Sequence, residues 1–270
     1  MIRARSARLV ATFDLLESLR SRKAVALLLL YLAGALGGSA LFIRLLHAIQ
    51  ERLRDQYGDA ANLQALMESP AMARMATELA GDAETAAAIV SIPPLALFYG
   101  WLAMNFVPLL VLFTSSDAIS GDLATGGVRY SLFRTDRASW VVGKLAGQTC
   151  LMALGVLVGA LGCWVMGLIW LDDMAIGASA WWLLQIAGRS IVYGFAYLGV
   201  ALCASQLTRT NARARALALL MMFACSLGGG LLQLEPVEEL SPDLMSALQK
   251  LFPNGHSLAL WHPGLVEHGT

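Results

Sequence analysis

The chain alternates between long apolar runs and shorter polar intervals. Five runs approach or exceed the roughly 20 residues that an α-helix needs to cross the hydrocarbon core of a bilayer, and each predicts a membrane-spanning helix. The predicted spans cover residues 24–46, 92–114, 140–171, 181–207 and 216–234. The third run is longer than a bilayer requires, so we expect that helix to tilt or to extend beyond the membrane.

The polar intervals also have helical character. Residues 1–23 are basic, and Leu9, Phe13 and Leu16 share one helical face, which predicts an amphipathic helix in the headgroup layer. Residues 47–88 are rich in strong helix formers and predict a helical insertion outside the bilayer. Residues 235–270 are polar to the end of the sequence, which predicts a further segment on the outer side.

The composition agrees with a membrane protein. Hydrophobic residues make up 57% of the chain and charged residues 14%, with a mean hydropathy of +0.63. A soluble domain carries about a quarter charged residues. The formal net charge of zero provides no general attraction to nucleic acid. We therefore expect an all-α, polytopic transmembrane helical bundle that is embedded in lipid and binds no nucleic acid.

Cysteine and histidine form no recognisable metal or disulfide motif. The four Cys residues lie within apolar runs without CxxC spacing, and the three His residues near the C-terminus lack HxxxH spacing. Small buried hydrophobic residues are the favoured interpretation of the Cys residues, and we expect no metal in this chain.

Lys and Arg residues are distributed unevenly among the polar intervals. If the N-terminus is cytoplasmic, most of them fall on the cytoplasmic side, within residues 3–23, 129–144 and 209–215. The opposite side then carries the acidic runs 172–173 and 235–239. The positive-inside rule therefore predicts a multi-pass protein of the bacterial cytoplasmic (inner) membrane with its N-terminus in the cytoplasm.

The interval 115–139 separates the second and third predicted spans. Ser116 can cap a short helix, and Gly126-Gly127 permits a turn before a second short helix. We expect a compact cytoplasmic knuckle whose charges suit docking onto a partner protein, although charges in loops are more often simply solvated. These charged residues are Asp117, Asp122, Arg129, Arg134 and Arg137.

The same interval resembles the signature of ABC-2-type transporter permeases. The pattern from Asp117 to Lys144 is D-A-I-x-G-D-x-x-x-G-G-x-x-x-S-L-x-R-x-x-R-x-x-x-V-x-G-K. The layout of the chain is also similar to that of the permease of the nitrous-oxide-reductase maturation transporter. The sequence departs from the family pattern at Asp122, where the family usually has Glu, and at residues 135–137, which replace a Pro-x-x-Arg.

The resemblance implies a function and a set of partners. In the family this interval forms the coupling helix that engages a separate cytoplasmic ATPase subunit, so ATP and Mg²⁺ would bind that subunit and no cofactor would bind this chain. Two permeases would pair, often as a homodimer, and a substrate would be exported between them. The implied coupling residues are Asp117, Gly121, Asp122, Gly126, Gly127, Arg129, Arg134 and Arg137.

The chain has no phosphate loop. Gly143-Lys144 lacks both the preceding Gly and the following Ser or Thr of that motif, so we do not expect this chain to be an enzyme.

The chain has five predicted spans where the family has six. We expect the sixth span to be missing through truncation.

One charged residue falls inside a predicted span. Arg189 has Gln185 one turn before it and Tyr193 one turn after it, which makes a polar stripe. The stripe can line a translocation path, because an intramembrane charge needs water, protein or a counter-charge. It can equally pack against another helix, with Arg189 reaching toward the membrane surface.

Glycines recur in the third predicted span. Gly155 and Gly159 form a GxxxG motif, which allows helices to approach closely. Packing within the chain is the favoured interpretation, ahead of a seam between two copies.

A second function stays open beside export. The chain could be a non-transporting mechanotransmitter or membrane anchor that passes ATPase motion to an extracytoplasmic partner, with residues 47–88 as the docking platform. An intramembrane enzyme would need paired catalytic groups within the spans, and Arg189 alone does not provide them.

Overall fold

The computed structural model describes residues 3–57, 74, 77, 92–171 and 175–231. The regular secondary structure of these residues is entirely helical, which confirms the predicted all-α class. Most of the predicted insertion 47–88 and all of residues 235–270 lie outside the described residues.

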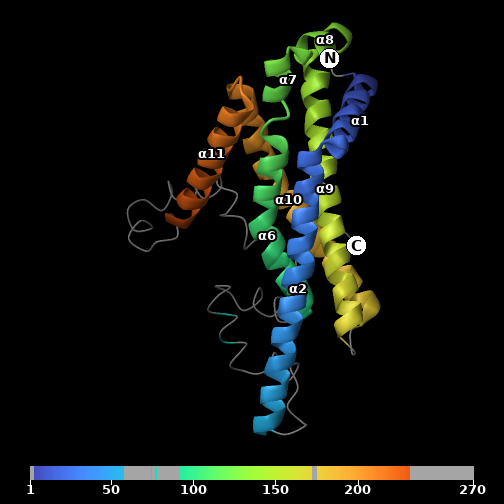
Figure 1. Cartoon of the computed structure of the whole chain (residues 1–270), viewed down its shortest axis with the longest axis vertical. Helices are drawn as coiled ribbons and strands as arrows, with labels where there is room; N and C mark the ends of the chain where they lie inside the picture. Colours follow the sequence, from blue (N-terminus) through green and yellow to red (C-terminus); the bar gives the residue numbers. More distant parts are fainter. Residues whose placement is uncertain (1–2, 58–73, 75–76, 78–91, 172–174, 232–270) are drawn as a thin grey trace.

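The described helices form an elongated bundle. They are α1 (Ala4–Arg20), α2 (Arg22–Tyr57), α6 (Pro94–Ser115), α7 (Ser120–Thr125), α8 (Gly127–Arg134), α9 (Arg137–Trp170), α10 (Ile176–Leu207) and α11 (Asn211–Leu231). The long helices α2, α6, α9 and α10 run along the bundle, and α1, α7 and α8 gather at one of its ends (Figure 1). We call this the α7–α8 end. Helix α11 starts near α7 and diverges from the bundle (Figure 1).

Four helices in the described part of the chain are long and apolar enough to cross a membrane, namely α2, α6, α9 and α10. They correspond to the first four predicted spans, so the chain is a multi-pass membrane protein. The fifth predicted span, 216–234, falls largely on α11, which begins earlier, at Asn211. Helix α2 continues unbroken past the predicted end at Leu46 to Tyr57, because residues 47–57 contain no Gly or Pro and many good helix formers.

Helix α1 presents two different faces. Leu9 and Phe13 are 68% and 66% exposed, and Leu16 is exposed beside them. Ala7 and Asp14 are buried on the other side, where α1 packs along α9. Helix α1 is therefore amphipathic, with an exposed apolar strip on one side and a face that packs on the protein on the other.

Two glycines of α9 allow α1 to approach closely. A Cβ atom at Gly143 would lie 2.6 Å from Cβ of Val10. A Cβ atom at Gly147 would lie 3.0 Å from the carbonyl oxygen of Ala11. The absence of side chains at these positions therefore sets the distance between the two helices.

The GxxxG motif further along α9 plays the same role for α2. A Cβ atom at Gly155 would lie 2.9 Å from Leu28, and one at Gly159 would lie 2.6 Å from the ring of Tyr31. The motif thus packs within the chain, as its favoured interpretation predicted.

Replacing Gly143 with Ala should displace α1 from α9. The added methyl group has no space, so we expect the free energy of unfolding to fall by about 1–3 kcal/mol, as is typical of overpacking. Thermal or denaturant unfolding of the purified protein measures this effect. Gly199→Ala is the matched control, because a Cβ atom there meets nothing within 4 Å. Equal stability of the two variants would contradict the packing argument.

Candidate coupling site

The segment between α6 and α9 folds into two short helices joined at Gly126. Gly126 has φ +74°, in the left-handed region that glycine adopts without steric strain. Its N–H donates to the carbonyl of Leu123 and ends α7, while Gly127 begins α8. The predicted knuckle with a turn at Gly126-Gly127 is therefore present. The prediction that Ser116 caps its first helix is wrong, because Ser116 ends α6 and α7 begins only at Ser120, after Ile119.

The start of α7 is tied to the end of α10. The backbone N–H groups of Ile119 and Ser120 donate to Oγ of Ser205 over 3.1 and 2.9 Å. The hydroxyl of Ser120 donates to Oδ1 of Asn211 over 3.2 Å. Gly121 lies against the same Asn211, since a Cβ atom there would be 3.7 Å from Oδ1. These contacts satisfy donors that a helix N-terminus leaves unpaired and fix α7 against α10 and α11.

Asp117, in the turn between α6 and α7, joins the base of the knuckle to α2 and α11. Its Oδ2 atom lies 2.7 Å from Nζ of Lys23, at the start of α2, and 2.7 Å from Nη2 of Arg215, in α11. One carboxylate oxygen therefore accepts hydrogen bonds from two cationic side chains. Asp117 was predicted as a docking charge, and the structure engages it inside the chain.

Asp122 is engaged in a second ion-pair network. Its Oδ2 atom lies 2.9 Å from Nζ of Lys144, and the same ammonium lies 2.6 Å from Oδ1 of Asp14. The side chains of Lys144 and Asp14 are only 7% and 5% exposed. Since a buried charge is stable only when it is paired, Lys144 holds α7 and α1 against α9.

Gln148 extends this network by one turn of α9. Its side-chain N–H donates to Oδ2 of Asp14 over 2.7 Å, so both carboxylate oxygens of Asp14 are paired. The hydroxyl of Ser115, the last residue of α6, donates to Oε1 of Gln148 over 2.9 Å and so connects α6 to the network. We refer to Asp14, Asp122, Lys144, Gln148 and Ser115 as the Lys144 network.

Asp136 caps the N-terminus of α9. Its Oδ2 atom accepts from the N–H of Ser139 over 3.1 Å, and Oγ of Ser139 accepts from the N–H of Arg3 over 2.8 Å. Hydrogen bonds from Ser139 lower the pKa of Asp136. The cap is therefore complete above the ordinary carboxyl pKa and is lost only as the pH falls through the lowered value.

Helix α8 has no buried residue and forms the exposed tip of the knuckle. Tyr130 and Phe133 are 79% and 87% exposed, and Arg129 and Arg134 are exposed beside them. Large exposed aromatic side chains flanked by polar groups mark interaction surfaces. The two arginines were predicted from the sequence and the two aromatic residues were not, although the spacing of three between the aromatic residues in a polar helix was the available signal.

The other predicted positions are dispersed. Arg137 is the exposed first residue of α9. Gln185, Arg189 and Tyr193 follow one edge of α10, away from the knuckle, and the hydroxyl of Tyr193 lies 3.1 Å from that of Tyr197. Arg189 is partly buried and forms no ion pair with the residues that the structure describes.

The described residues contain no cluster of His, Cys, Asp and Glu that could hold a metal ion. All four cysteines are free thiols.

Asp14 and Lys144 were not predicted as partners. The signals in the sequence were a single Asp on the helical face opposite Leu9 and Phe13, and the pair Lys144 and Gln148 one turn apart at the start of an apolar helix. Neither signal identifies its partner, because the two segments are separated by 130 positions.

Replacing Lys144 with Met should be strongly destabilising. Asp14 would then keep a buried charge without its cation, so we expect the free energy of unfolding to fall by about 3–5 kcal/mol. The double variant Asp14→Asn with Lys144→Met should regain part of this loss, because it leaves no charge buried between α1 and α9. Denaturant unfolding of the wild type and both variants tests this. A double variant as unstable as Lys144→Met alone would contradict the pairing argument.

Comparison with known proteins gives the family. The family model described as ABC-2 family transporter protein matches residues 8–249, which include most of α1 and all the other helices that the structure describes. No curated protein matches the chain. Since the matched region covers most of the sequence, the chain belongs to the ABC-2 transporter family and is a membrane-embedded component of an ABC transporter.

Proposed function

We propose that the chain is the permease subunit through which a separate ATPase subunit drives export of a substrate across the cytoplasmic membrane. The exposed aromatic and basic tip of α8, on a knuckle whose acidic residues are already paired within the chain, is the observation that carries this proposal. Membership of the family supports the ATPase as partner. In this proposal the α7–α8 end faces the cytoplasm, in agreement with the positive-inside rule.

The knuckle divides anchoring and docking between its two helices. Asp117 and Asp122 anchor it to the bundle through ion pairs. Tyr130 and Phe133 project outward with Arg134 beside them, so their partner is an apolar pocket on the ATPase with an acidic rim.

The Lys144 network would transmit ATPase motion. Any displacement of α7 moves Asp122, and the shared ammonium of Lys144 conveys this to α9 and to Asp14 in α1. Packed helices with paired buried charges move as rigid bodies rather than bending freely. Motion at the knuckle would therefore reach the spans.

The translocation path is placed by this proposal between two permease copies, with Gln185, Arg189 and Tyr193 beside it. Arg189 supports the proposal, because a partly buried cation inside a span is costly unless water, a partner or a substrate compensates it. The likeness to the nitrous-oxide-reductase maturation permease stays a prediction, as does an extracytoplasmic partner at residues 47–88.

Truncating Phe133 to Ala should weaken binding of the ATPase subunit. An aromatic anchor buried at the centre of an interface contributes about 2 kcal/mol or more, so we expect the dissociation constant to rise about thirtyfold. Co-purification and titration with the cognate ATPase subunit measure the effect. Phe223→Ala, which truncates a Phe that is also exposed but lies on α11, is the matched control. Unchanged affinity of Phe133→Ala would overturn the docking role of α8.

Reversing the charge of Arg134 should act in the same direction. Arg134→Glu places an anion against the acidic rim, so we expect co-purification to be lost while the unfolding midpoint stays unchanged. Arg52→Glu is the control, since Arg52 is exposed near the far end of α2. A lowered unfolding midpoint of Arg134→Glu would show that Arg134 is structural.

Transport itself separates the exporter from the mechanotransmitter. Inside-out vesicles that contain both subunits should accumulate at least one cell metabolite only when ATP is present, as detected by untargeted mass spectrometry. Vesicles with Asp122→Asn should hydrolyse ATP without this accumulation, because the variant removes the ion pair between the knuckle and α9 while Lys144 stays paired with Asp14. ATP hydrolysis stimulated by the wild-type chain, without accumulation of any compound and without transfer of any lipid between the leaflets, would instead favour the mechanotransmitter.

A further inference from the structure

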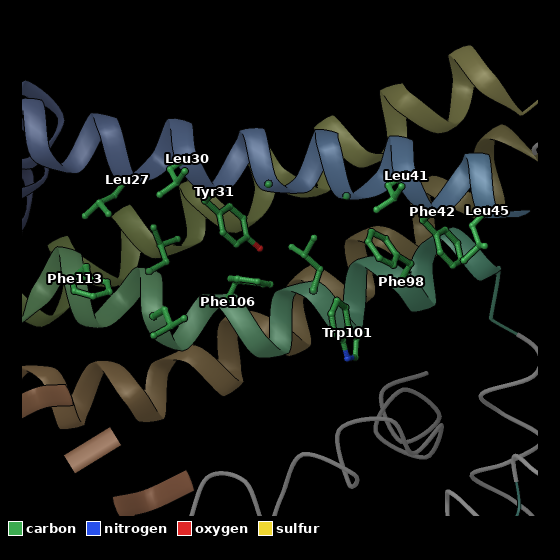
Figure 2. Close-up of a pocket in the computed structure, with 15 residues that line it drawn as sticks. Leu27, Leu30, Tyr31, Leu41, Phe42, Leu45, Phe98, Trp101, Phe106 and Phe113 are labelled. Carbon is green, nitrogen blue, oxygen red and sulfur yellow. The ribbon is translucent and has the colours of Figure 1, made fainter. Parts of the chain in front are cut away.

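An apolar groove with a volume of about 760 Å³ lies between α2 and α6. Leu27 and Phe113 lie at one end of it, and Phe42 and Phe98 lie toward the other (Figure 2). The rings of Phe42 and Phe98 stack with centroids 4.6 Å apart. Apart from the hydroxyl of Tyr31 and the indole N–H of Trp101, the described side chains that line the groove are purely hydrocarbon.

The groove follows most of the depth of a membrane. Leu27 and Leu45 both line it and are separated by five turns of α2, which corresponds to about 27 Å along the helix axis. The hydrocarbon core of a bilayer is about 30 Å thick. A ligand in the groove would therefore lie among acyl chains, where an uncharged lining favours a hydrocarbon ligand over a polar one.

Glycines of α2 open the groove. A Cβ atom at Gly34 would meet nothing within 4 Å, so the space above it is empty of protein. Gly38 lies against Phe98, since a Cβ atom at Gly38 would lie 3.2 Å from Cζ of the Phe98 ring. A larger residue at Gly34 would fit without a clash and would occupy the groove.

The groove ends at a cluster with excess positive charge. Lys23 is one turn before Leu27 in α2, and Asp117 follows Phe113 by four residues, so their ion pair lies just beyond the lining residues at the α7–α8 end of the groove. Arg215 shares the same carboxylate oxygen. Two cations thus face one anion, and Nε of Arg215 has no acceptor among the described residues.

We propose that this groove and the Lys23–Arg215 cation pair bind a long-chain anionic amphiphile, with its hydrocarbon tail along α2 and α6 and its phosphate or carboxylate at the two cations. The proposal rests on the proposed function, since it names the substrate class of the permease. The apolar groove selects a tail, and the surplus charge selects an anionic headgroup.

The charge of the α7–α8 end favours an anionic amphiphile as the occupant. The exposed charged side chains at this end are mostly arginines, among them Arg20, Arg22, Arg129, Arg134, Arg209 and Arg213. An anionic headgroup would compensate part of this charge, whereas an uncharged lipid would not.

The tail site is tested with a phosphatidylglycerol that carries a diazirine on its acyl chain. The full chain is reconstituted into phosphatidylcholine nanodiscs with this probe, and photolabelled peptides are quantified by mass spectrometry. We expect labelling of α2 and α6 to fall about tenfold in Gly34→Leu, because excluding two or more methylene groups from apolar contact lowers affinity by about this factor. Gly37→Leu is the matched control, since it is also open but does not line the groove.

The headgroup site is tested by charge removal. Lys23→Gln should reduce labelling by the phosphatidylglycerol probe about fivefold, the usual effect of one basic residue at an anionic membrane surface. Lys23→Arg should retain labelling, and Arg22→Gln, the neighbouring exposed cation, should not change it. A phosphatidylcholine probe with the same tail should label the groove weakly and equally in all three variants.

The outcomes separate this inference from the proposed function. The amphiphile site is overturned if the groove of Gly34→Leu is labelled as strongly as that of the wild type. It is also overturned if the phosphatidylglycerol and phosphatidylcholine probes label the wild-type groove equally. A change in oligomeric state in Gly34→Leu also overturns it, because the groove would then hold a second copy. ATPase binding by Gly34→Leu is measured in parallel. Its retention is expected, whereas failure of even the wild-type chain to bind the ATPase would overturn the permease role and leave the lipid result standing.

Discussion

A single buried ammonium group, that of Lys144, governs the architecture of the α7–α8 end. Because it lies near the start of a membrane-spanning helix and is buried, it needs a negative counter-charge. Burying an unpaired charge costs more free energy than the surrounding packing contributes. Asp14 and Asp122 supply that compensation from α1 and α7. The positions of α1 and of the knuckle are therefore coupled through Lys144. If either one leaves α9, Lys144 loses one of the two carboxylates that pair with it.

Glycine positions complement this electrostatic constraint. Gly143 and Gly147 bring α1 so close that Asp14 reaches Lys144 and Gln148 of α9. Farther along α9, glycines admit Leu28 and Tyr31 of α2. On α2 itself, Gly34 faces no protein atom within 4 Å and leaves open a groove that Tyr31 also lines. The same residue type thus permits close contact in α9 and leaves open space in α2.

The sequence predicts the helices well and the contacts poorly, for physical reasons. Apolar runs of membrane length identify spans directly, and Gly126-Gly127 identifies a turn because few other residues adopt a positive φ. The predicted docking charges illustrate the limit. Asp117 and Asp122 look like solvent-facing loop residues in the sequence, and only tertiary structure pairs them with Lys23, Arg215 and Lys144. Such pairings depend on helix packing, which residue spacing does not encode.

Asp117 connects the two proposals made for this chain. Asp117 belongs to the segment that would move with the ATPase. Its carboxylate is also the anion that partly neutralises Lys23 and Arg215 at the end of the groove. A shift of the knuckle that withdraws Asp117 would leave two cations without their counter-charge, and an anionic headgroup would then bind more strongly. A shift that restores Asp117 would compete with the headgroup for the same donors. Nucleotide-driven motion would thereby control occupancy of the groove by exchange of one carboxylate, without any need to reshape the apolar walls.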